Sequence, residues 1–239
     1  MIKKRIDIRV LSNDILIGNC DYIKLEKEQY TTGFYFYLNQ FNFIKQVTFD
    51  QGDVLTIQIY YYNRFNIKMH LFNFEIYLID DIHENNSIRI FGLMIPIDGI
   101  IYDQRIIDIF YRWHNNEEID WWTLDVDYKE SFLYCCGSYS GLFKEIARKT
   151  YAINCLSVNE KLDFYYLLGY TFFGNKGYFG DSLYTLGDCL TEIYNNSNSL
   201  KNLNLKFVNH QKLILIFGEE YFNEICSLFE SADVKILKN

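Results

Sequence analysis

The chain has 239 residues, 49% of them hydrophobic and 18% aromatic, a composition that predicts folded domains and excludes a disordered chain. Its formal net charge of -8 at pH 7 argues against nucleic acid as a direct ligand and favours cationic partners. No window reaches ~18 uninterrupted apolar residues and the amino terminus lacks a signal-peptide pattern, so we expect a cytoplasmic protein with no membrane span. From the length of the chain we expect two domains.

Residues 14–136 predict mainly β-strands. Aromatic and β-branched residues dominate this region with partial alternation, which is typical of strands buried on one face. Turn residues such as Gln51-Gly52-Asp53 separate the apolar runs. The clearest predicted strands are 34–38, 54–60, 74–79 and 87–91. Together they predict an antiparallel β layer.

The end of this region mixes helical and extended patterns. One face of a short helix is predicted from Ile106, Ile107, Ile109, Phe110 and Trp113. Residues 120–127 return to an extended, alternating pattern, 132–136 predict a buried strand and 137–141 a loop. With a boundary near residue 148, we expect residues 1–148 to form an α+β domain that is mainly antiparallel β. The sequence assigns this domain no role.

Residues 149–239 follow an α/β order. Strands are predicted at 151–155, 203–208 and 234–237, and helices at 159–168, 182–194 and 219–230. On the helix at 182–194, apolar residues at 183, 186, 189, 190 and 193 share the arc that faces the core. Tyr184, Asp188 and Thr191 project together on the opposite side, with Gly187 beside them. Ser182 or Asp181 is the predicted helix cap.

The sequence offers no signature of catalysis or of a cofactor. Its six cysteines lack the spacing of a disulfide framework and are expected as reduced core thiols. The adjacent pair Cys135-Cys136 leaves a redox or metal role open, although burial in a strand explains it as well. The four histidines are scattered without metal-ligand spacing, so no metal site is expected. Trp113, Trp121 and Trp122 fit either a core or a second binding patch.

Two short runs of sequence resemble the barstar family of ribonuclease inhibitors. They are Tyr178-Phe179-Gly180-Asp181-Ser182-Leu183 and Leu186-Gly187-Asp188-Cys189-Leu190-Thr191. The resemblance covers residues 149–239, about the length of a barstar domain. It implies a three-stranded parallel sheet covered by helices. It also implies an immunity protein, not an enzyme, that occludes the cationic active site of a cognate toxin nuclease.

The resemblance further implies which residues meet the partner. In the family, the aspartate at the position of Asp188 enters the phosphate pocket of the ribonuclease. A glutamate on the last helix corresponds to Glu230 or, in another register, to Ser231. Two positions depart from the family, because a carboxylate is replaced by Tyr184 and an aromatic residue by Gly187. The candidate partner-binding residues are Tyr178, Phe179, Gly180, Asp181, Ser182, Tyr184, Thr185, Gly187, Asp188, Thr191 and Glu230.

The sequence is also compatible with two other functions. The barstar-like region could serve a non-enzymatic scaffold or regulatory protein that uses the fold for subunit pairing. Alternatively, the β-rich domain could be a hydrolase that the barstar-like domain regulates. We expect no cofactor, no metal and no direct nucleic-acid ligand, and a monomer or a 1:1 complex with a toxin nuclease.

Overall fold

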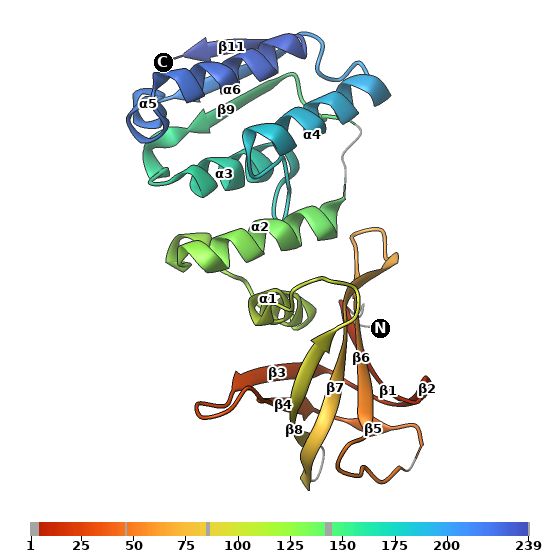
Figure 1. Cartoon of the computed structure of the whole chain (residues 1–239). Coiled ribbons are helices and arrows are strands. Elements are labelled where there is room, and N and C mark those ends of the chain that lie inside the picture. Colours follow the sequence, from red (N-terminus) through yellow and green to blue (C-terminus); the bar gives the residue numbers. More distant parts are fainter. Residues whose placement is uncertain (1–4, 46, 85–86, 142–144, 239) are drawn as a thin grey trace. The chain divides into compact units, whose positions relative to one another are not determined.

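The computed structural model describes residues 5–45, 47–84, 87–141 and 145–238 (Figure 1). The chain divides into two compact units, Met1–Trp122 and Thr123–Asn239. This division lies earlier in the sequence than the boundary expected near residue 148. Among the described residues, no helix is sufficiently long and apolar to cross a membrane.

The first unit is built on a curled, antiparallel eight-stranded sheet with the strand order β3-β4-β8-β7-β6-β1-β2-β5. Alternation is clearest in β6, where Leu55, Ile57, Ile59 and Tyr61 are buried and their neighbours face outward. The predicted antiparallel layer is therefore confirmed. The strands are β1 (Ile6–Ser12), β2 (Ile15–Cys20), β3 (Tyr22–Lys27), β4 (Phe34–Asn39), β5 (Asn42–Phe43), β6 (Val54–Tyr62), β7 (Lys68–Glu84) and β8 (Ser87–Pro96).

Helix α1 (Gln104–His114) follows the sheet and contributes to its core. The five apolar residues predicted to form its inner face are all buried, so that prediction is confirmed. The Asp103 side chain caps the helix by accepting a hydrogen bond from the Arg105 amide at 3.0 Å. Of the three tryptophans, Trp113 and Trp121 are buried whereas Trp122 is 44% exposed.

The second unit begins with a helix where the sequence predicted extended chain. Residues 121–123 form a 3₁₀ turn, and α2 runs from Val126 to Ser140, so the extended segment at 120–127, the strand at 132–136 and the loop at 137–141 are all wrong. Asp125 starts the helix by accepting a hydrogen bond from the Tyr128 amide at 2.8 Å. The buried residues of α2, at 129, 131, 132, 133, 135, 136 and 140, lie on more than one side of the helix.

The rest of this unit is a parallel three-stranded sheet, ordered β11-β10-β9, with helices. Helix α3 contacts β9, α6 contacts β11 and α4 contacts α6. The elements are β9 (Thr150–Asn154), a 3₁₀ turn (Cys155–Ser157), α3 (Lys161–Phe173), α4 (Leu183–Asn196), β10 (Leu203–Val208), α5 (Gln211–Phe217), α6 (Glu219–Ser231) and β11 (Val234–Lys238). The predicted α/β order is thus confirmed, and all six cysteines of the chain lie buried as free thiols.

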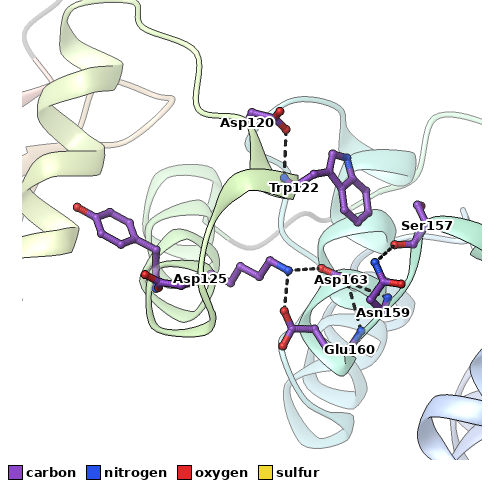
Figure 2. A network of polar contacts seen from close by, with 9 residues as sticks. Asp120, Trp122, Asp125, Ser157, Asn159, Glu160 and Asp163 are labelled. Atoms are coloured by element: carbon purple, nitrogen blue, oxygen red, sulfur yellow. Dashed lines mark hydrogen bonds and ion pairs between the residues drawn. The ribbon is translucent and has the colours of Figure 1, made fainter.

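A buried ion cluster connects α2 to the start of α3 (Figure 2). Lys129 donates hydrogen bonds to Glu160 Oε1 at 2.6 Å and to Asp163 Oδ1 at 2.8 Å. The other oxygen of Asp163 accepts the backbone amide of Asn159 at 2.9 Å. Asp163 has no exposed surface, and Lys129 is 7% exposed. These contacts explain why α2 belongs to the second unit.

Candidate protein-binding groove

The loop before α4 is fixed by a buried ring and a glycine. Phe179 is fully buried and packs edge-on against Phe172, with ring centroids 4.8 Å apart, and against Phe229 at 6.0 Å. Gly180 has a φ of +92°, and a Cβ there would lie 2.6 Å from the amide nitrogen of Leu186. Phe179 and Gly180 were expected among the partner-binding residues, but here they anchor the loop and offer no side chain to a partner.

Three polar residues of the candidate set close the first turn of α4. The Ser182 hydroxyl accepts from the Thr185 amide at 3.3 Å, and the Thr185 hydroxyl accepts from the Ser182 amide at 3.0 Å. This reciprocal pair is a capping box. The Thr185 hydroxyl also donates to Asp181 Oδ1 at 2.8 Å. Asp181, Ser182 and Thr185 therefore hold the amino end of the helix.

Helix α4 has the two faces that its sequence predicts. Leu186, Cys189, Leu190 and Ile193 are buried, and burial raises the pKa of the Cys189 thiol to about 12, with Asp188 and Asp181 acting in the same direction. Tyr184, Asp188 and Thr191 are exposed, as predicted, and Tyr184 reaches 79%. Leu183 differs from its prediction, because it is only half-buried and lines a groove.

The exposed face of α4 forms one wall of a groove whose other wall is α6. Its larger section has a volume of about 1040 Å³. The smaller section, of about 360 Å³, shares Leu183, Tyr184 and Leu228 with it. The larger section is also lined by Glu219, Glu220, Asn223, Glu224 and Ser227. The smaller is also lined by Gly187, Asp188, Leu190, Thr191, Tyr194, Ser231 and Ala232.

The charge of the groove is entirely negative. Its lining includes the carboxylates of Asp188, Glu219, Glu220 and Glu224. Neither α4 nor α6 contains a lysine or arginine. Within the described parts of the chain, none of the four carboxylates has a salt-bridge partner. The groove therefore presents unneutralised negative charge beside apolar side chains.

The structure distinguishes the two candidates on the last helix. Ser231 lines the smaller section together with Asp188, whereas Glu230 is exposed on α6 outside the lining of both sections. Gly187 lies opposite Leu228, and a Cβ on it would be 3.6 Å from Leu228 Cδ2. That distance is an ordinary van der Waals contact, so the backbone of α4 does not require glycine at position 187.

Tyr178 lines a separate pocket and not the groove between α4 and α6. A Cβ placed on Gly137 of α2 would lie 3.5 Å from the ring of Tyr178. A small pocket of about 290 Å³ joins Tyr178 and Asp181 to α2 residues that include Tyr134. Burial raises the pKa of Tyr178, and the Asp181 carboxylate raises it further. Tyr178 is therefore half-buried at the start of the loop and separate from Tyr184 and Asp188.

Sequence reasoning missed three of the four glutamates of α6, namely Glu219, Glu220 and Glu224. The available signal was the joint absence of lysine and arginine from residues 177–200 and 213–234. Among the described residues, no cluster of three or more His, Cys, Asp or Glu side chains is placed to hold a metal ion. The arrangement offers an anionic, partly apolar binding surface.

Comparison with known proteins gave no relative, since no family model, no curated protein and no solved structure matches this chain.

Proposed function

We propose that the chain is an immunity protein that inhibits a cognate toxin nuclease by occluding its cationic active site. The observation that carries the proposal is the groove between α4 and α6, whose four carboxylates have no salt-bridge partner among the described residues and whose two helices carry no basic residue. A nuclease cleft must be cationic to hold phosphate. Asp188, exposed on the wall of the groove, can form short charge-assisted hydrogen bonds with an arginine or lysine in such a cleft.

The resemblance of residues 178–191 to the barstar family supports the same function. The parallel sheet with helices in the second unit is the architecture that the resemblance implies. In this proposal Asp188 is the central contact, Tyr184 and Thr191 flank it, and Ser231 contributes from α6. The protein acts by binding in the cytoplasm, without catalysis, cofactor or direct contact with nucleic acid.

Pairing of two identical copies through this groove is disfavoured by charge. An isologous interface places the same patch on both subunits, so four carboxylates on each side would face each other. Like charges in such an interface weaken association. A cationic partner of a different sequence meets no such repulsion. Sedimentation of the pure chain, with and without the nuclease, distinguishes a scaffold that pairs with itself from an inhibitor that forms a 1:1 complex.

The test is inhibition of a basic nuclease encoded next to this gene, measured with a fluorogenic RNA substrate. The Asp188→Ala variant should inhibit at least tenfold more weakly than the native chain, a loss of about 1.4 kcal/mol or more. Glu130→Ala is the matched control, because Glu130 is also an exposed carboxylate on a helix of the second unit but lies on α2. An unchanged affinity for Asp188→Ala, or an equal loss for Glu130→Ala, would reject the proposed contact.

A further inference from the structure

The larger section of the groove extends along most of α6, from Glu219 to Leu228, and does not include Asp188. Its apolar lining is Leu183, Leu228 and the ring of Tyr184, while Glu219, Glu220 and Glu224 supply its charge. From Glu219 to Leu228 the lining follows α6 for about 14 Å, at roughly 1.5 Å per residue. This length matches between two and three turns of a helix laid alongside.

The carboxylates of this section are not explained by the stability of α6 alone. Glu219 and Glu220 lie in the first turn, where the helix dipole favours negative charge. Glu224 lies beyond that turn. It is four residues after Glu220, so the two carboxylates repel each other across one turn of the helix. Neither residue has a basic neighbour on α6 to relieve the repulsion. A bound cation would relieve it.

We propose that this section of the groove binds a basic amphipathic α-helix of the partner protein. The apolar side of that helix packs on Leu183 and Leu228, and its lysines or arginines reach the α6 glutamates. Insertion of an amphipathic helix into an apolar groove is a general mode of recognition, and the charge of this groove selects a basic helix. This inference rests on the proposed function only where it assigns the basic helix to the nuclease that Asp188 contacts. The helix would be a second contact with that nuclease, outside the active-site cleft of the nuclease.

The position of the charges predicts what this contact does. Glu220 and Glu224 are exposed at the surface, where charges accelerate encounter with an oppositely charged partner. Salt screens such charges over ~10 Å at 0.1 M ionic strength. Binding to the α6 section should therefore weaken as salt rises, while packing on Leu183 and Leu228 determines where the helix lies.

The experiment titrates the full-length, ¹⁵N-labelled chain with a synthetic peptide of about 18 residues, in which leucine and lysine follow helical spacing. A peptide with glutamate in place of lysine is the negative probe. The amides of Asn223 and Ser227, which line the section, should shift with the lysine peptide only. The Glu220→Gln/Glu224→Gln variant should bind about fivefold more weakly.

A matched double variant, Glu130→Gln/Glu145→Gln, removes the same two charges from exposed positions on the same unit, outside the groove. Its affinity for the peptide should stay within twofold of the native chain. Equal losses in the two double variants, or amide shifts confined to other surfaces, would overturn the inference.

The inference and the proposed function fail separately. Intact inhibition that depends on Asp188, together with absence of peptide shifts at Asn223 and Ser227, would overturn the α6 contact alone. Peptide binding that depends on Glu220 and Glu224, in a chain whose Asp188→Ala variant inhibits the nuclease unchanged, would support the α6 contact and reject the active-site mechanism.

Discussion

Replacing Lys129 by methionine tests the ion cluster on which the second unit depends. Methionine preserves most of the apolar stem and removes the charged amino group with its hydrogen bonds to Glu160 and Asp163. Asp163, which has no exposed surface, would then keep its backbone hydrogen bond from Asn159 but lose its ion pair with Lys129. Glu160 is less affected, because about a third of its side chain is exposed to water.

The expected loss is large because one charge stays buried. Removing one member of a buried ion pair typically destabilises a protein by about 3–5 kcal/mol. We expect Lys129→Met to fall in this range. Lys129→Met/Asp163→Asn should recover part of the loss, because asparagine removes the buried negative charge and still offers an oxygen to the amide of Asn159. The coupling between the two changes should be about 0.5–3 kcal/mol.

The pH dependence follows from the pKa of Lys129. Burial alone would lower this pKa, but hydrogen bonds to Asp163 and Glu160 and the charges of both carboxylates outweigh it, so the pKa lies above its usual value of 10.5. A group whose pKa is raised on folding contributes fully below its unfolded pKa and loses its contribution as pH rises through the folded one. The contribution of the Lys129 charge to the stability difference between native and Lys129→Met chains should therefore persist up to about pH 10.5 and decline above it.

Urea unfolding followed by far-ultraviolet circular dichroism measures these effects, since urea leaves charge interactions unscreened. The three tryptophans, at 113, 121 and 122, all belong to the first unit, so their fluorescence provides a separate signal for that unit. Lys201→Met is the control, because Lys201 is exposed. A loss below 1 kcal/mol for Lys129→Met, or one equal to that of Lys201→Met, would refute the buried pair.

Three further outcomes concern α4. Gly180→Ala should destabilise the second unit by at least 1 kcal/mol in thermal unfolding, because the added Cβ would lie 2.6 Å from the Leu186 nitrogen at a positive φ; a neutral effect would contradict this geometry. Gly187→Ala should stabilise it by up to about 1 kcal/mol, since alanine favours the helix and its Cβ meets Leu228 Cδ2 at 3.6 Å; a loss of stability would show that the site is closed. The Cys189 thiol, 8% exposed with a pKa near 12, should react with a disulfide reagent at pH 8 only after unfolding, and rapid native reaction would contradict its burial.

Local pattern predicted most elements because their periodicity was unambiguous. The alternation of β6 and the 3.6-residue spacing of α4 each fit one structure. The run at 132–136 does not, since five consecutive apolar residues fit a buried strand and a helix buried on several sides equally well. The outcome is decided by Asp125 at the helix start and by the contact of Lys129 with Asp163, a residue 34 positions away. A contact between residues so far apart in the sequence cannot be predicted from the periodicity of residues 132–136.

The candidate site shows the same limit. The outward position of Tyr184, Asp188 and Thr191 follows from helical spacing within one segment, and the structure confirms it. Glu219, Glu220 and Glu224 of α6 join them only because α4 packs against α6, with Leu228 opposite Gly187. No pattern within either helix encodes that contact. The sequence indicates the contact only indirectly, because residues 177–200 and 213–234 both lack lysine and arginine.

The candidate residues that do not line the groove contribute to binding indirectly, because they hold the start of α4 in one conformation. Phe179 and Gly180 fix the entry to α4, and the Ser182 and Thr185 pair closes its first turn. A surface that is already ordered loses less conformational entropy when a partner binds. Loosening the entry should therefore weaken binding of any partner even though no contact is removed. Gly180→Ala then predicts weaker nuclease inhibition with a salt dependence equal to that of the native chain, whereas Glu220→Gln/Glu224→Gln predicts a reduced salt dependence.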